Sequence, residues 1–213
     1  LDRSASMTAG RPGRGKHEVL AELALVLARM FTRAGNRVGA LFFDTGILRV
    51  VPPGTTRRHV LRIAAELGRT ARARGGATTD LGEMLDAAGR LARRRSLILV
   101  LSDFIGEGDW ERSLQRLARR HEVVALRIVD TADDVLPEAG LIVIEDAETG
   151  EQLIVDSADP LLRAGLRSAV DAREERLAAG MRRARVPMHR IDTDRDLTQA
   201  LVEVVARTRS RAR

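Results

Sequence analysis

A run of six residues, 96–101 (Ser-Leu-Ile-Leu-Val-Leu), constrains the fold of this chain more than any other feature. The run is too short for a typical helix and shows no polar alternation, so it predicts a strand that is buried on both faces. Residues 38–43 form a second apolar run of this kind. Segments with helical periodicity separate the two runs, and this alternation is typical of a mostly parallel sheet covered by helices on both faces. We therefore expect an α/β fold.

Apolar spacing and stop signals predict the other elements. The expected helices are residues 16–33, 57–74, 81–94, 110–120, 160–184 and 197–207. The further strands expected are residues 48–51, 123–129 and 188–191, with a hairpin of residues 141–145 and 152–155. Asp159 is the expected N-cap of the long helix, with Pro160 at its first position. The chain has 213 residues and no long linker, so we expect a single domain over residues 1–213 with a frayed tail, residues 207–213.

Composition excludes several kinds of chemistry. The chain has no cysteine, which excludes disulfides, thiolate metal sites, iron–sulfur clusters and cysteine nucleophiles. Its net charge of +6 comes from one lysine and 35 arginines spread among 30 acidic residues, and aromatic residues make up only 2%. A diffuse charge with few stacking side chains does not favour nucleic acid as the partner. A basic nucleic-acid-binding domain is kept as an alternative.

The sequence gives no sign of a membrane segment. No stretch approaches the roughly 20 apolar residues that span a bilayer, and the first residues lack the layout of a signal peptide. We expect a cytoplasmic protein without membrane contact in this part. The opening residues Leu-Asp-Arg-Ser read as the end of a strand, so we also expect further chain upstream, which could carry a membrane segment.

Short side chains that carry oxygen lie at the ends of predicted strands and helices, where the fold can bring them close together. Asp2, Ser4 and Ser6 alternate, Thr79 and Asp80 precede a helix, and Asp103 ends the most apolar strand. Ligands of α/β folds bind at the carboxyl ends of the strands, and Mg²⁺ prefers oxygen donors. These positions predict a metal site for Mg²⁺ or Mn²⁺. For residues 2–6 alone, a turn in which the side chains bond nearby backbone groups is the simpler interpretation.

The order Asp2-x-Ser4-x-Ser6, then Thr79, then Asp103 resembles the metal-ion-dependent adhesion site of von Willebrand factor type A domains. More narrowly, residues 2–7 (Asp-Arg-Ser-Ala-Ser-Met), 79–81 and 101–104 resemble the bacterial domain of unknown function 58 family. Further matches extend this resemblance over nearly the whole chain.

The resemblance implies a Rossmann-like sheet whose first, central strand ends at Asp2 and is truncated here. It implies that Ser4 and Ser6 bind the metal directly, Thr79 directly or through water, and Asp2 and Asp103 largely through waters. An acidic side chain of a protein partner would complete the site. The family also implies an adaptor or chaperone-like role beside a MoxR-type AAA+ ATPase or its client, without catalytic activity.

Two enzymatic alternatives are weaker. Residues 10–16, from Gly10 to Lys16, match the first seven positions of a phosphate-binding P-loop, but His17 replaces the hydroxyl residue and no strand precedes the loop. We therefore interpret residues 10–16 as a glycine-rich loop, and the alternative of a nucleotide-binding protein that uses these residues is disfavoured. A hydrolase with Ser4 or Ser6 as nucleophile lacks the nucleophile-elbow sequence. We expect a protein that is not an enzyme.

Overall fold

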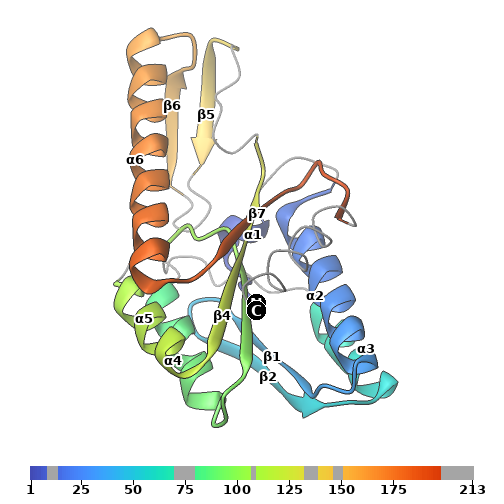
Figure 1. Ribbon diagram of the computed structural model, residues 1–213. Helices are drawn as coiled ribbons and strands as arrows, with labels where there is room; N and C mark the ends of the chain where they lie inside the picture. The colour runs from blue at the N-terminus through green and yellow to red at the C-terminus, as the bar shows by residue number, and fades with distance from the viewer. Residues whose placement is uncertain (9–13, 70–79, 107–108, 132–138, 146–150, 198–213) are drawn as a thin grey trace.

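The structure is a computed structural model that describes residues 1–8, 14–69, 80–106, 109–131, 139–145 and 151–197 (Figure 1). Its centre is a parallel sheet with the strand order β3-β4-β7. Two antiparallel hairpins, β1–β2 and β5–β6, accompany it. The strands are β1 (Val38–Phe43), β2 (Ile47–Gly54), β3 (Leu97–Ser102), β4 (Glu122–Val129), β5 (Leu141–Glu145), β6 (Gln152–Asp156) and β7 (Met188–Asp192).

Residues 1–3 connect the β1–β2 hairpin to the parallel sheet. Asp2 N donates a hydrogen bond to Leu101 O of β3 at 3.0 Å. On the other side, Arg3 N donates to Phe43 O of β1 at 2.7 Å, and Asp2 pairs with Phe43 in parallel. The segment that ends at Asp2 is therefore bonded on both sides, in the central position that was expected for it.

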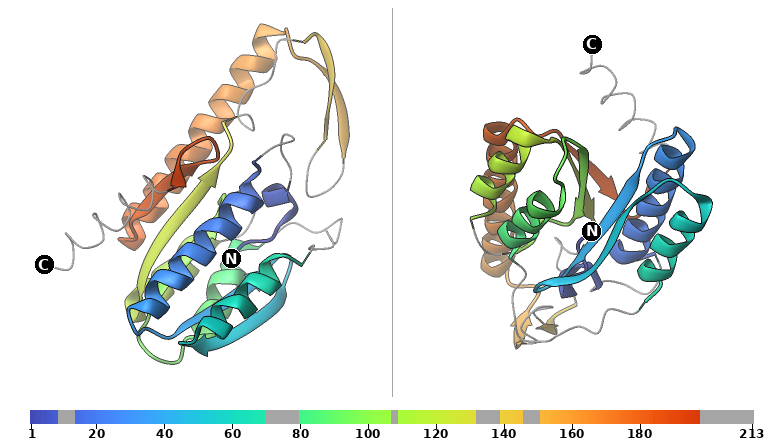
Figure 2. Two further views of the ribbon diagram at one scale, coloured as in Figure 1. Left: turned by 90° about the vertical axis from the view of Figure 1, so that its right-hand side faces the viewer. Right: turned by 90° about the horizontal axis from the view of Figure 1, so that it is seen from below.

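Helices cover both faces of the parallel sheet (Figures 1 and 2). Alternate residues of β4 contact different cores: Leu126 packs in the cluster of α2 and α3, whereas Ala125 packs in the cluster of α4, α5 and α6. The prediction of parallel strands covered on both faces is confirmed. The helices are α1 (Ala5–Thr8), α2 (Lys16–Arg33), α3 (Arg57–Leu67), α4 (Leu81–Leu91), α5 (Trp110–Arg120) and α6 (Pro160–Ala184).

Two helices end earlier than their periodicity predicted. α4 ends at Leu91 rather than residue 94, and α3 ends at Leu67, with Gly68 as its C-cap. The side chain of Arg3 explains the end of α3, because its guanidinium donates to Leu67 O at 2.9 Å and to Arg69 O at 3.0 Å. A contact between residues this far apart in the chain leaves no trace in local spacing. The last predicted helix beyond Leu197 and the tail 207–213 lie outside the described residues.

The long helix α6 begins as predicted, with Asp159 accepting a hydrogen bond from Leu161 N at 2.8 Å. Near its other end, Gly180 allows close contact with α5, since a Cβ there would lie 2.5 Å from Trp110 Cη2. The N-terminal half of α6 and the β5–β6 hairpin extend beyond the sheet (Figure 2). Within the described ranges, no helix combines the length and the apolar run that crossing a membrane requires.

Candidate functional site

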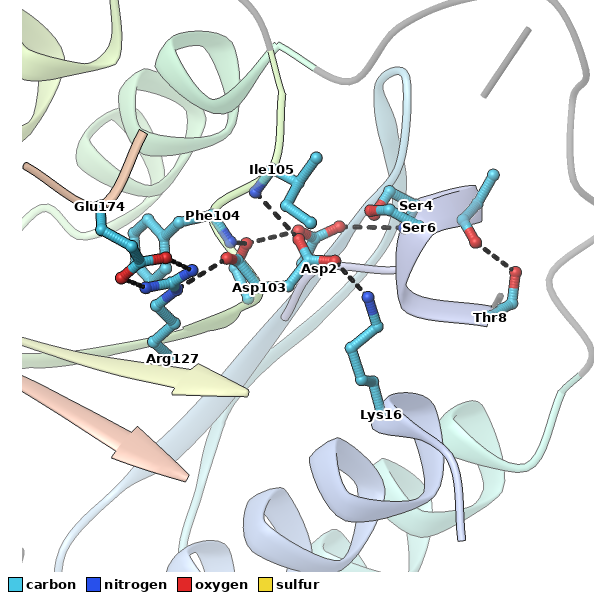
Figure 3. Close-up of polar contacts among 12 residues, drawn as sticks. Asp2, Ser4, Ser6, Thr8, Lys16, Asp103, Phe104, Ile105, Arg127 and Glu174 are labelled. Atoms are coloured by element: carbon cyan, nitrogen blue, oxygen red, sulfur yellow. Dashed lines mark hydrogen bonds and ion pairs between the residues drawn. The ribbon is translucent and has the colours of Figure 1, made fainter. Parts of the chain in front are cut away.

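Two buried carboxylates, those of Asp2 and Asp103, meet at one edge of the sheet (Figure 3). Asp2 belongs to the segment that hydrogen-bonds to β3, and Asp103 directly follows the last residue of β3. Their exposed fractions are 0% and 2%. The structure thus brings these two predicted site residues together, because neighbouring parallel strands end at the same edge of a sheet.

Hydrogen bonds fix both oxygens of Asp2. Its Oδ1 accepts from Ser4 N at 2.9 Å, and its Oδ2 accepts from Ser102 Oγ at 2.6 Å. The bond from Ser4 N is the turn contact that the simpler interpretation of residues 2–6 predicted for Asp2. The hydroxyls of Ser4 and Ser6, for which that interpretation predicted bonds to the backbone, instead bond each other. The bond from Ser102 comes from β3 and holds the carboxylate toward Asp103.

The two serine hydroxyls lie beside this carboxylate. Ser4 directly precedes the single turn of α1, and Ser6 lies within it. Their Oγ atoms are 3.0 Å apart, and both residues are buried. A hydroxyl carries one hydrogen and two lone pairs, so this pair retains acceptor capacity toward a third group. The turn of α1 thus places two oxygen donors next to Asp2.

Asp103 is held by the loop that follows it and by one lysine. Its Oδ1 accepts from Ile105 N at 3.0 Å, and its Oδ2 accepts from Lys16 Nζ at 2.9 Å. Phe104, which lies between Asp103 and Ile105 in the chain, has a φ of 57°, in the left-handed region that residues other than glycine rarely adopt. Phe104 N donates to Ser102 Oγ at 2.8 Å, which helps to hold this conformation. Strained residues of this kind concentrate at functional sites.

The electrostatics of the centre favour a cation. Burial, and then the charge of Asp103, raise the pKa of Asp2 from 3.8 to about 6. Both carboxylates are buried, and that of Asp103 pairs with the ammonium of Lys16. Carboxylate and hydroxyl oxygens are the donors that hard cations such as Mg²⁺ prefer, so the donor set fits such an ion. In the described residues, no three acidic or histidine side chains lie together so that they could hold a metal ion, so an ion here would depend on the serines and on water as well.

Behind the centre, the buried Arg127 pairs with the partly exposed Glu174, and sequence reasoning missed this pair. Arg127 Nε donates to Asp103 O at 3.2 Å, and its two terminal nitrogens donate to the two carboxylate oxygens of Glu174 on α6. These hydrogen bonds lower the pKa of Glu174. A signal existed, because Arg127 interrupts an apolar strand and a buried charge needs a partner.

Ser102 and Lys16 were also missed as members of the centre. In the sequence, only its position before Asp103 pointed to Ser102. Lys16 is the sole lysine of the chain, but the sequence assigned it to the alternative P-loop. In the structure Lys16 is the first residue of α2, and its ammonium binds Asp103; residues 10–13 of the P-loop match lie outside the described residues.

Thr79 also lies outside the described residues. Asp80, which was considered with it, is exposed and caps α4 by accepting a hydrogen bond from Glu83 N at 3.1 Å. The structure therefore brings together Asp2, Ser4, Ser6 and Asp103, and gives Asp80 a different role.

Comparisons with known proteins match the chain to one family. A model of the family described as protein of unknown function DUF58 matches residues 1–176. The chain is 33% identical over 209 residues to the uncharacterised protein Rv1480 of Mycobacterium tuberculosis, covering 98% of this chain and 66% of the relative. It is 34% identical over 157 residues to the uncharacterised protein MAV169 of Mycobacterium avium, covering 73% and 91%. The chain thus spans just under two thirds of the length of the Mycobacterium tuberculosis relative.

One solved structure shows a similar fold. The crystal structure of the conserved hypothetical protein BatB from Bacteroides thetaiotaomicron aligns with a TM-score of 0.52, 15% sequence identity, and coverage of 98% of this chain and 96% of that chain. At this identity the likeness concerns the fold alone.

Proposed function

Since the chain belongs to the family of proteins of unknown function DUF58, we propose that it is a metal-ion-dependent protein-interaction module with a von Willebrand factor type A-like, Rossmann-like fold. One observation carries this proposal. The carboxylates of Asp2 and Asp103 and the hydroxyls of Ser4 and Ser6 are buried together at the carboxyl ends of the strands.

These residues would contribute in different ways to the binding of a Mg²⁺ or Mn²⁺ ion. Ser4 and Ser6 supply hydroxyl oxygens, Thr79 supplies a third, and Asp2 and Asp103 supply the negative charge. Ser102 and the backbone N–H groups of Ser4 and Ile105 orient the two carboxylates. When bound, the ion supplies a positive charge that can accept a carboxylate from another protein.

A binding role suits these contacts better than a catalytic one. The hydroxyls of Ser4 and Ser6 bond to each other, whereas a nucleophilic serine needs a base within hydrogen-bond reach. The partner we propose carries an acidic side chain on its surface. A MoxR-type AAA+ ATPase or its client is the candidate, for which this chain would act as an adaptor.

Binding assays with the purified MoxR-type ATPase of the same organism test this function. The wild-type protein should bind it in Mg²⁺ and not in EDTA. Asp103→Asn and Ser4→Ala should lose the Mg²⁺-dependent binding, while Asp109→Asn, which changes an exposed carboxylate that pairs with Arg112, should retain it. Equal binding in Mg²⁺ and in EDTA would contradict the proposal.

A further inference from the structure

Lys16 places a positive charge inside the very centre that is proposed to hold a metal ion (Figure 3). Its ammonium lies 2.9 Å from Asp103 Oδ2, and the side chains of Lys16 and Asp103 are 2% and 3% exposed. We propose that Lys16 determines the cation specificity of this site: its ammonium occupies Asp103 in the metal-free protein, so that only a divalent ion gains enough to displace it. The inference rests on the proposed metal function and adds to it a residue that opposes the binding of monovalent cations.

The helix around Lys16 holds its backbone in place. Gly15 is the N-cap of α2, and Gly15 N donates to Glu18 Oε2 at 2.6 Å. The following turns of α2 are anchored by Val19, Leu20 and Leu23, which are fully buried. Any adjustment to an incoming ion is therefore made by the lysine side chain, not by the helix.

Lys16 is at an unfavourable position for a cation unless a carboxylate compensates it. The N-terminal end of a helix carries partial positive charge, which opposes an ammonium at the first helical position. Burial adds a desolvation cost for the charged group. The contact with Asp103 offsets both effects, so Lys16 and Asp103 stabilise each other as long as no other cation takes the carboxylate.

Charge then separates divalent from monovalent ions. A Na⁺ or K⁺ ion that took Asp103 would replace one unit charge by another and would cost the buried ammonium its 2.9 Å contact with Asp103. A divalent ion brings a second unit charge to a centre with two buried carboxylates, those of Asp2 and Asp103, and Coulomb interactions are strong in such a buried place. Lys16 thereby lowers the affinity for every cation, but it abolishes binding only for monovalent ones.

Calorimetric titration of the full chain with Mn²⁺, after removal of metals, tests this role. Lys16→Met should bind Mn²⁺ about tenfold or more tightly than the wild type, because the competing charge is gone. Arg14→Met is the matched control: it also removes one positive charge, two residues away, from an exposed side chain that pairs with Glu22 at 2.7 Å. This control should leave the Mn²⁺ affinity within about twofold of the wild type.

A second titration addresses specificity directly. At equal ionic strength, replacing choline chloride by potassium chloride should weaken Mn²⁺ binding to Lys16→Met and leave the wild type unchanged. If Lys16→Met does not fold, Lys16→Gln, which keeps a hydrogen-bond donor and removes the charge, takes its place with the same expectations.

The outcomes separate the inference from the function on which it rests. Mn²⁺ binding to the wild type with equal or weaker binding to the Lys16 variants would overturn the inference and leave the proposed metal site standing. An absence of Mn²⁺ binding to the wild type and to all variants would overturn both.

Discussion

Two buried basic residues reach Asp103 from opposite faces of the sheet, and their surroundings differ in charge. Arg127 donates to the carbonyl oxygen of Asp103 and to both carboxylate oxygens of Glu174, so its charge is balanced by a partner of its own. Lys16 pairs with Asp103 in a centre where the charge of Asp103 also raises the pKa of a second buried carboxyl, that of Asp2. In the first region an arginine faces one carboxylate, whereas in the second region two carboxylates oppose each other's ionisation.

The difference indicates which region serves the fold and which awaits a ligand. A balanced, two-point ion pair holds α6 to the end of the sheet without further help. Two carboxylates that are buried close together oppose each other's ionisation, which lowers stability unless a cation binds between them. We therefore expect changes near Arg127 to alter stability with little effect on metal binding, and changes near Asp2 to alter both.

The largest expected effect is on the balanced pair. Glu174→Gln leaves the buried Arg127 without its counter-charge and should lower the free energy of unfolding by about 3 kcal/mol near neutral pH. Because the pKa of Glu174 is lowered in the folded protein, its stabilisation is present above the ordinary pKa of 4.5 and is lost as the pH falls below it. Urea denaturation at several pH values measures both effects.

The exposed neighbour Glu175 supplies the control for this variant, since Glu175→Gln should change the unfolding free energy by less than about 0.5 kcal/mol. Glu174→Gln should also keep its Mn²⁺ affinity within about threefold of the wild type. A full loss of metal binding would show that the two regions are not separable.

The next effect has the opposite dependence on pH. The pKa of Asp2 is raised to about 6 in the metal-free protein. The stabilisation from its bound proton is therefore complete below the ordinary pKa of 3.8 and is lost as the pH rises through about 6. In EDTA, the wild type should lose up to about 3 kcal/mol relative to Asp2→Asn between about pH 4 and pH 7.

Paired urea titrations of the wild type and Asp2→Asn measure this difference. Mn²⁺ at saturating concentration should remove the loss from the wild type, because the ion compensates the ionised carboxylate. A constant difference between the two proteins at every pH would contradict the account of a buried Asp2 whose ionisation is opposed by burial and by Asp103.

The smallest effect concerns Ser102, which supports Asp2 and the strained Phe104. Ser102→Ala removes the hydrogen bonds to Asp2 Oδ2 and from Phe104 N, and should cost about 1–2 kcal/mol. Because the bond from Ser102 lowers the pKa of Asp2, that pKa should rise further in the variant. Carboxyl chemical shifts followed by NMR across a pH titration check this, with Ser96→Ala, which changes an exposed hydroxyl, as control. A lower pKa of Asp2 in Ser102→Ala would contradict it.

Local patterns predicted the regular elements well. The helices Lys16–Arg33 and Trp110–Arg120 and the strand Val38–Phe43 have the bounds that their spacing predicted. Apolar periodicity was sufficient for the two helices because each buries one face along its length, and an uninterrupted apolar run was sufficient for the strand. Apolar periodicity was insufficient at the end of α3, where the guanidinium of Arg3 binds the carbonyls of Leu67 and Arg69.

The candidate site was predictable in part for a similar reason. Asp2 and Asp103 could be placed together because both end strand segments that lie side by side in a parallel sheet. The sequence could not predict the roles of Lys16, Arg127 and Glu174, because these roles depend on which helix faces which strand. That information is spread over the whole chain.

The central claim is that Asp2, Ser4, Ser6 and Asp103 form one cation site, and Mn²⁺ titration of the full chain with Ser4→Ala as the variant tests it most directly. The account predicts that the wild type and the exposed-site control Ser96→Ala bind one Mn²⁺ with the same affinity, while Ser4→Ala binds at least about tenfold more weakly. Mn²⁺ binding that is undetectable in the wild type at millimolar concentration, or equal in the wild type and Ser4→Ala, would contradict it.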